Sequence, residues 1–275
     1  MMARGAWLVE RPRNLFGLVL VVLLVVTVLL GLLWTPYDPI AIDLGHPLQP
    51  PSLAHWLGTD QFGRDVLSRA MIGARISAGV ALETVIAAAV CGTAFGLFTG
   101  YLRGWTDRLI MMLGDAVLAF PPILLALALV AIMGPSRHSV MLALSIAYVP
   151  VVTRVVRGSV LSIREGEYIQ ASVLCGDSTL YTLFRHVLPN AVAPIVVLAT
   201  SLFGWVVLYE SALSFLGVGV PPPAPTWGNM LADSRPYMET ASWLSIVPGL
   251  CIVGTLLGVN LLGDALRDWL DPRER

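Results

Sequence analysis

Residues 76–102 read ISAGVALETVIAAAVCGTAFGLFTGYL and contain one charged side chain, Glu83. A helix needs about 20 apolar residues to cross the roughly 30 Å hydrocarbon core of a bilayer, and this run is longer than that. It is too long for a strand of a membrane barrel, which has about 10 residues. Because a spanning helix satisfies its backbone hydrogen bonds internally, the stretch predicts a transmembrane helix.

The rest of the chain has a similar composition. Of its 275 residues, 56% are hydrophobic and 13% are charged, whereas soluble domains carry about 25% charged residues. We therefore expect an all-α membrane protein with six transmembrane helices. Their approximate ranges are 15–34, 76–102, 109–133, 139–156, 191–215 and 243–262. Pro121 and Pro122 are expected to kink the third helix.

The first apolar run is expected to remain in the mature protein. It is longer than the apolar core of a signal peptide, and Trp34, Thr35 and Pro36 follow it in place of a small-residue cleavage site. A proline-rich polar stretch comes next. Residues 61–75 then have a near-helical spacing of apolar positions, which predicts an interfacial helix leading into the second span.

Arginine placement predicts the orientation, because short cytoplasmic segments are enriched in basic residues. The chain has no lysine, and its net charge of −1 argues against a nucleic-acid partner. With the N-terminus inside, the inner segments hold Arg4, Arg11, Arg13, Arg103, Arg108, Arg154, Arg157, Arg164, Arg185, Arg267, Arg273 and Arg275, and the outer segments hold Arg64, Arg69, Arg75, Arg137 and Arg235. Both termini and residues 167–190 are therefore expected in the cytoplasm, and residues 217–242 outside.

Small residues recur on two of the expected spans. Glycines stand at 92, 96, 100 and 104, and again at 249, 254 and 258. Small side chains let membrane helices approach closely. The pattern predicts close packing within the chain, and a subunit interface is the alternative.

Residues 167–190, EYIQASVLCGDSTLYTLFRHVLPN, form a polar interruption between apolar runs. Gly176 is expected to end a first short helix, and Asp177 or Ser178 to cap a second. In the second helix Leu180, Leu183, Phe184 and Val187 have the spacing of a single apolar face. Pro189 is expected to stop this helix, and Asn190 to cap the next span. Two ordered segments in a loop indicate an element that another protein contacts.

Four motifs carry a resemblance to a known family. Gln170-Ala171-Ser172, Gly176 and Val187-Leu188-Pro189 match the EAA loop of bacterial ABC importer permeases in order and spacing. Residues 55–77, 211–231 and 260–272 match further motifs of one subfamily. The chain resembles the C-type permease of dipeptide, oligopeptide and nickel importers over nearly its whole length. The resemblance implies a type I ABC importer transmembrane (MetI-like) core of five helices plus an N-terminal helix.

The resemblance also implies a division of the chain and a set of contact residues. Residues 1–75 would hold the N-terminal tail, the first span and a periplasmic segment, and residues 76–268 the transmembrane domain, with a coupling loop at 164–189. ATPase coupling would fall to Glu167, Gln170, Ala171, Ser172, Gly176, Asp177, Leu180, Leu183, Phe184, Leu188 and Pro189. The glutamate that gives the loop its name is Gln170 here. Docking is therefore expected to rest on shape, without an obligatory ion pair at that position.

No catalytic or metal-binding set is visible in the sequence. The four histidines, His46, His55, His138 and His186, lie in separate segments. A phosphate-binding P-loop requires a lysine, and the chain has none. We therefore expect no enzyme activity, no metal and no cofactor in this chain, with ATP and Mg bound by partner ATPase subunits.

The resemblance implies the other partners and the location. They are a homologous B-type permease subunit, two ABC ATPase subunits, a periplasmic or lipid-anchored substrate-binding protein, and membrane lipid. The expected location is the bacterial inner membrane. The motifs leave the substrate open between di- or oligopeptides and nickel or a metal chelate. Peptides are favoured because the histidines form no nickel site.

Ionisable groups inside spans are functional candidates. Glu83, Asp115 and Glu210 lie within the expected helices. Local pairing is one interpretation of all three. In the other, Glu83 and Glu210 face an outer vestibule on the translocation path and meet a cationic group of the substrate. An ion-gradient-driven transporter using them as a proton relay is the alternative from a different functional class.

Overall fold

The structure of the chain, a computed structural model, describes residues 12–270, without the side chain of Val173. Arg4, Arg11, Arg273 and Arg275, which enter the arginine pattern, lie outside the described residues. The helices are α2 Pro12–Leu33, α3 Val66–Leu102, α4 Trp105–Leu118, α5 Pro122–Met133, α6 Arg137–Arg164, α7 Glu167–Leu174, α8 Thr179–Thr182, the π-helix η1 Leu183–Val187, α9 Leu188–Phe215, α10 Trp227–Asp233, the 3₁₀ helix η2 Arg235–Tyr237, and α11 Trp243–Leu270.

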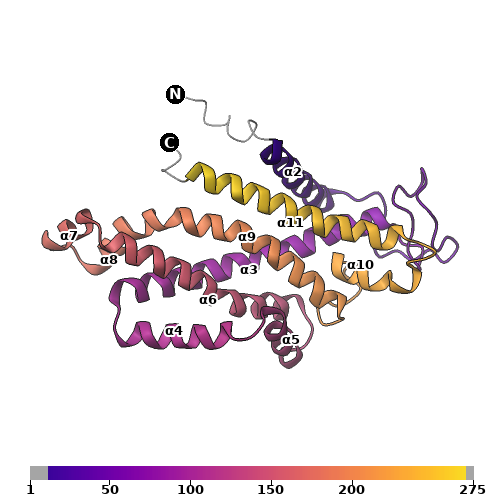
Figure 1. Cartoon of the computed structure of the whole chain (residues 1–275). Helices are drawn as coiled ribbons and strands as arrows, with labels where there is room; N and C mark the ends of the chain where they lie inside the picture. The colour runs from indigo at the N-terminus through magenta and orange to yellow at the C-terminus, as the bar shows by residue number, and fades with distance from the viewer. Residues whose placement is uncertain (1–11, 271–275) are drawn as a thin grey trace.

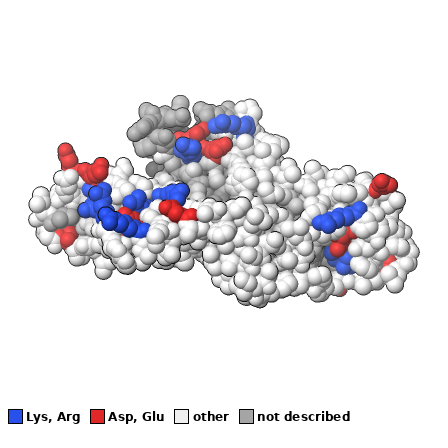
Figure 2. Space-filling view, turned by 60° about the horizontal axis from the view of Figure 1, so that its bottom comes forward, with Lys and Arg blue, Asp and Glu red and all other residues white. Residues whose placement is uncertain are grey.

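The long helices lie side by side in an elongated bundle (Figure 1). We call its two ends the α8 end, where α7 and α8 lie, and the α10 end, where α10 and the loop of residues 34–65 lie. An ion pair of 2.8 Å between Arg13 and Asp268 joins the start of α2 to the last turns of α11. On the face shown in Figure 2, charged side chains gather at the α8 end, beside the grey terminal residues and at the α10 end. The surface between them is uncharged, as expected where lipid or another membrane subunit covers it.

The most extensive contact between helices of the bundle is that of α3 with α6. A methyl group added to Gly92, Gly96 or Gly100 would lie 2.5, 2.6 or 2.7 Å from the Cβ of Val152, Val156 or Val160, respectively. The glycines therefore provide the space for a row of valines, and the prediction of close intramolecular packing is confirmed at these three positions. Gly104 lies beyond the end of α3, and a methyl group added there would meet nothing within 4 Å.

This register shows that α3 and α6 run parallel. The segment between them must therefore carry the chain back from the α8 end towards the α10 end. It does so as α4 and α5, which are bent by 91° at the break between them. Within residues 12–270 five helices are long and apolar enough to span a membrane, and the α4–α5 pair, counted as one span, is the sixth.

The prediction of one kinked helix at 109–133 is wrong in form. Pro121 has an extended backbone (φ −55°, ψ 130°), and α5 starts afresh at Pro122. A residue before proline is driven out of the helical region, and proline lacks the amide hydrogen that continues a helix. Two consecutive prolines therefore break the helix, which a single proline only bends.

Two other predicted boundaries are also corrected. The interfacial helix expected at 61–75 is not separate, because α3 begins at Val66 and continues unbroken into the span. Asp65 caps it by accepting a hydrogen bond from the amide of Ser68 at 2.8 Å. Likewise α6 extends to Arg164, beyond the predicted end at 156. Asp65, as the cap of α3, was the signal in the sequence that a helix begins at Val66.

Pro189 does not stop a helix, contrary to the prediction. Residues 179–215 form one continuous helical segment through α8, η1 and α9. In the π turn the amide of Leu188 donates to the carbonyl of Leu183, five residues back. This wider turn accommodates the proline ring that follows, which in a regular α-helix clashes with the carbonyl four residues back. Asn190 does not cap either, since its Nδ2 donates to the carbonyl of His186 at 2.7 Å.

The α3–α6 contact makes a stability prediction. Gly96→Ala should destabilise the protein by about 1–3 kcal/mol, the usual cost of overpacking, because the new methyl would also lie 2.8 Å from the carbonyl oxygen of Thr153. Thermal unfolding of the purified chain in detergent measures the effect as a fall in Tm.

Gly158→Ala is the matched control on α6. Nothing lies within 4 Å of its added methyl group, and alanine favours a helix over glycine by about 0.5–1 kcal/mol. Its Tm should stay equal or rise. Equal Tm changes in the two variants would contradict the packing argument.

Candidate functional site

The loop between α6 and α9 folds into a compact element at the α8 end (Figure 1). α7 ends at Leu174, and the chain turns at Gly176, whose φ of +89° is a left-handed conformation that favours glycine. Ser178 then caps α8, its hydroxyl accepting from the amide of Tyr181 at 3.3 Å. The predicted break at Gly176 and the cap at Ser178 are confirmed.

A small hydrogen-bonded group ties α7 to α8. The Ser172 hydroxyl donates to Asp177 Oδ2 at 2.6 Å and lies 3.3 Å from the Thr182 hydroxyl. Ser172 and Thr182 are buried. Asp177, which was a candidate cap, instead accepts from Ser172 across the turn. The two short helices are thereby held at one relative angle by their own side chains.

The predicted single apolar face of the second helix is divided between core and surface. Leu183 and Val187 are buried in the main core, with exposed fractions of 1% and 0%. Leu180 and Phe184 are 57% and 59% exposed. The prediction of one face is therefore wrong. Regular helical spacing does not hold across η1, where the π turn changes the rotation per residue.

The element carries a set of large apolar side chains exposed at its surface. We call them the exposed apolar set; its members are Tyr168, Leu174, Leu180, Tyr181 and Phe184. Phe184 also borders a groove of about 390 Å³ between α3 and α9. Single exposed apolar residues are ordinary, but a cluster on so small an element marks an interaction surface.

The predicted ATPase-contact residues fall into three groups. Ser172 and Leu183 are buried, and Leu188 is half-buried. Those at the surface are Glu167, Gln170, Ala171, Gly176, Asp177, Leu180, Phe184 and Pro189. Gln170 Nε2 makes a long hydrogen bond of 3.5 Å to the carbonyl of Glu165. The structure thus brings the predicted residues together, and separates those available to a partner from those that hold the element in place.

The arginines of α6 near this element are engaged within the chain. Arg157 binds Asp107 through two hydrogen bonds of 2.7 and 2.8 Å. Arg154 binds Asp115 at 2.5 Å. Arg164 donates to the carbonyl of Tyr101 at 2.7 Å. These contacts join α6 to α3 and α4, so local pairing accounts for Asp115.

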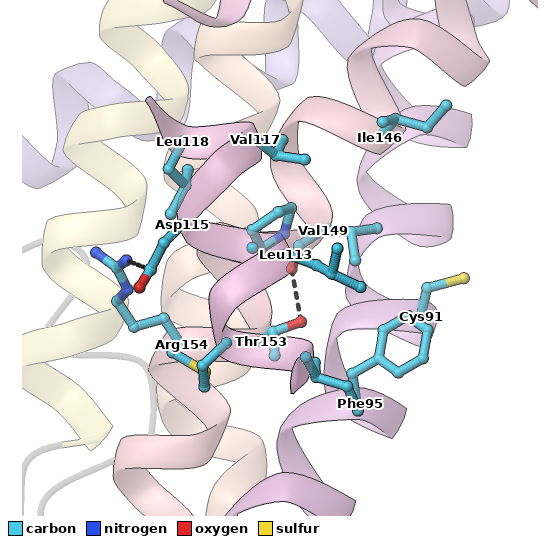
Figure 3. A pocket seen from close by; sticks show the side chains of 14 residues that line it. Cys91, Phe95, Leu113, Asp115, Val117, Leu118, Ile146, Val149, Thr153 and Arg154 are labelled. Carbon is cyan, nitrogen blue, oxygen red and sulfur yellow. Dashed lines mark hydrogen bonds and ion pairs between the residues drawn. The ribbon is translucent and has the colours of Figure 1, made fainter. Parts of the chain in front are cut away.

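A groove of about 410 Å³ lies between α3, α4 and α6 (Figure 3). Its lining is almost wholly apolar, and Asp115 and Arg154 meet at its edge, across α4 from Cys91 and Phe95. Within the described residues no group of three or more His, Cys, Asp or Glu side chains could hold a metal ion. The groove therefore suits the binding of an apolar surface or a small ligand better than it suits a catalytic reaction.

The two predicted path residues have different environments. Glu83 pairs with Arg137 of α6 at 2.5 Å, and both side chains are about half exposed. Glu210 is fully buried and accepts a hydrogen bond from Ser214 at 2.8 Å. The prediction that Glu210 faces an outer vestibule is therefore not supported by the structure, because the carboxyl group is enclosed by its own helix and its neighbours.

The segment 217–242, which was expected outside the membrane, contains the short helix α10. Thr226 and Asn229 form a capping box that starts α10, and the spacing of these residues was a signal in the sequence. Trp227 is buried, and its Nε1 donates to the carbonyl of Ala70 at 3.1 Å. Asp233, at the end of α10, lies 3.9 Å from Arg69, and burial raises the pKa of this carboxyl. α10 is thereby fixed on α3.

Comparison with known proteins identifies the family. Residues 92–275 match the family described as binding-protein-dependent transport system inner membrane component. The chain is 43% identical to the dipeptide transport system permease protein of Alkalihalophilus pseudofirmus, over 94% of this chain and 84% of that protein. The chain belongs to this family. The permease is also 42% identical to a di/tripeptide transport system permease protein of Pseudomonas aeruginosa, over 94% and 87% of the two chains.

A third relative has a different named substrate. The permease is 44% identical to the glutathione transport system permease protein of Pectobacterium atrosepticum, over 86% of this chain and 79% of the relative. Membership makes the chain a multi-pass transmembrane subunit of an ABC transporter that is not itself catalytic. It works with ATPase subunits and a substrate-binding protein. The predicted family and fold class are confirmed.

The neighbours Leu183 and Phe184 make a stability prediction for the permease. Leu183→Ala should cost about 2–5 kcal/mol, as for other buried leucines, and lower the Tm of the chain in detergent. Phe184→Ala should leave Tm nearly unchanged, because that side chain is mostly exposed. A similar Tm loss in both would contradict the division of the helix between core and surface.

Proposed function

We propose that the chain is the C-type permease subunit of an ATP-driven importer of di- or oligopeptides in the bacterial inner membrane. The observation that carries this is the naming of its relatives. Those at 41–44% identity, covered over most of their length, are named for dipeptides, di/tripeptides, peptides or glutathione, which is itself a tripeptide.

The order of spans supports the proposed orientation. With α4 and α5 as one span the count is even, so the start of α2 and the end of α11 lie on the same side as the α7–α8 element. Arg154 and Arg157 of α6, and the pair of Arg13 with Asp268, lie towards this end. The positive-inside rule supports placing it in the cytoplasm, with α10 and residues 34–65 in the periplasm.

The α7–α8 element is the proposed docking site for one of two ABC ATPase subunits, which bind ATP and Mg. Two features support this. The exposed apolar set gives a contact surface, and the Ser172–Asp177 hydrogen bond keeps the element in one shape. The Gln170 side chain is exposed and, among the described residues, makes only the long hydrogen bond to Glu165, so the proposed docking depends on shape and apolar contact.

The structure offers a direct route from this site into the membrane. α8, η1 and α9 are continuous, so a displacement of α8 moves α9 as part of the same helix. A homologous B-type permease is the proposed partner in the membrane, and a periplasmic or lipid-anchored binding protein the partner at the α10 end. Transport then proceeds by alternating access, in which ATP favours one of two arrangements of the helices.

Reconstitution tests the proposal. The permease, its partner permease, the ATPases and the binding protein are placed in liposomes, and uptake of a radiolabelled dipeptide is measured with and without ATP. Uptake that requires ATP and binding protein is expected. Uptake driven by an ion gradient without ATPases would reject the ABC importer, and uptake of Ni²⁺ but no peptide would reject the substrate class.

The docking surface gives a further prediction. Leu180→Asp combined with Phe184→Asp should reduce copurification of the ATPase subunits at least tenfold, because desolvating a carboxylate against an apolar partner is costly. The measurement is the ratio of ATPase to permease after affinity purification.

Leu53→Asp is the control for this double variant. Leu53 is exposed at the opposite, α10 end of the bundle, so the same substitution there should leave the ratio unchanged. Normal ATPase recovery with the Leu180 and Phe184 variant would show that the ATPase docks elsewhere.

A further inference from the structure

The ion pair between Glu83 and Arg137 is unusual for its place in the bundle. Glu83 Oε1 and Arg137 Nη2 are 2.5 Å apart, and the side chains are 46% and 41% exposed. The guanidinium fits because α3 has a glycine at 79, where an added methyl would lie 3.1 Å from Arg137 Nη2. The pair is therefore built into the seam between α3 and α6, with one side open.

The level of the pair can be measured along α3 from the α10 end. Met71 packs against Gly31, in the last turn of α2, where an added methyl would lie 2.8 Å from the Met71 carbonyl oxygen. A helix rises 1.5 Å per residue, which places Glu83 about 18 Å further along the bundle.

The α8 end gives a second reference level. Gly96 of α3 packs against Val156 of α6. Val155, beside it, borders the same groove as Arg267 near the end of α11. Glu83 lies about 20 Å from Gly96 along α3. Since a bilayer core is about 30 Å thick, Glu83 lies inside it, and Arg137, the first residue of α6, reaches Glu83 from the α10 side.

An exposed ion pair at this depth does not face lipid. Charged groups inside membranes face a water-filled cavity or a protein interior, and mark substrate pathways. Among the described residues the Nε of Arg137 is buried and has no hydrogen-bond partner, so the contact to Glu83 is made by Nη2. By contrast, Asp115 and Arg154 lie near the level of Arg267, at the α8 side of the hydrocarbon core.

We infer that Glu83 and Arg137 line the translocation path and bind the two charged ends of a zwitterionic peptide. Glu83 receives the α-ammonium group, and the Arg137 guanidinium receives the α-carboxylate. This inference rests on the proposed peptide import. It assigns to the membrane domain a selection step additional to that of the binding protein.

The chemistry explains why a zwitterion suits the site. When the pair opens on such a ligand, each charge exchanges one partner of opposite sign for another, and none is left unpaired in a medium of low polarity. A peptide blocked at one end leaves Glu83 or Arg137 without a counter-charge, which is strongly unfavourable. The planar guanidinium also matches a carboxylate in two-point binding.

The groove of Figure 3 continues the site along the same face of α3. Residues 83, 87 and 91 recur every four residues and therefore lie on one stripe of the helix. Cys91 and Phe95 line the groove, opposite Ile146 and Val149 of α6. Its volume of about 410 Å³ is within the range of small-ligand sites. An apolar groove beside a charge pair suits the side chains of a short peptide.

Water access is tested first, because it does not require the pair to be altered. In a background with Cys91, Cys175 and Cys251 replaced by serine, Ala87→Cys is treated with a membrane-impermeant thiol reagent in the assembled transporter. We expect labelling, and at least fivefold slower labelling in the presence of transported dipeptide. Leu23→Cys, on the exposed face of α2, is the lipid-facing control and should remain unlabelled.

The charges are tested in the same liposomes. Glu83→Gln combined with Arg137→Gln should reduce dipeptide uptake at least tenfold per assembled complex, and exchange of the two residues, Glu83→Arg with Arg137→Glu, should restore part of it. The inference is overturned if Ala87→Cys is as unreactive as Leu23→Cys, or if the doubly neutral variant transports at the wild-type rate.

The outcomes separate this inference from the proposed function. If the wild-type assembly imports no peptide, the proposed function fails. If it imports peptide and Ala87→Cys reacts in the isolated chain but not in the assembly, a neighbouring subunit covers the pair, and only the pathway inference fails.

Discussion

The close parallel contact of α3 with α6 is the constraint on which the rest of the structure depends. In a membrane there is little hydrophobic drive between helices, so packing must come from close approach. Three glycines spaced by four residues meet three valines with the same spacing, and this fixes both register and direction. Because the two helices are parallel, the intervening chain must return across the membrane. The broken α4–α5 span and the even number of spans follow from that.

The π turn at Leu183–Val187 joins the surface element to this core. It turns Leu183 and Val187 into the core while Leu180 and Phe184 stay outside. A proline two residues later would normally end a helix, but here the helix continues to Phe215. The π turn thus places two apolar side chains of the pattern in the core, where they stabilise the fold, and two at the surface, where a partner can contact them. It also keeps α8 continuous with a membrane-spanning helix.

The sequence predicted the features that depend on composition and spacing. It predicted less well the features that depend on contacts with other helices. The apolar runs predicted the spans, and the glycine repeat predicted the close contact that α3 makes with α6. The turn at Gly176 was visible because it needs a special backbone conformation. The break at Pro121 and the continuity at Pro189 were both misjudged, since the same residue type breaks a helix in one context and is accommodated after a π turn in another. Whether a carboxylate in a span is enclosed, as Glu210 is, or exposed, as Glu83 is, depends on helices far away in the chain.

The position of the Glu83–Arg137 pair within a rigid unit constrains how it can work. Both residues belong to helices locked together by the glycine–valine contact, so rocking of the bundle moves them as one body and leaves their distance unchanged. Movement of α8 is transmitted to α9, which carries neither residue. A change of the ATPase state alone therefore does not separate the charges. In the proposed mechanism their separation requires a ligand that replaces both partners at once, which couples the opening of the pair to the chemistry of the substrate.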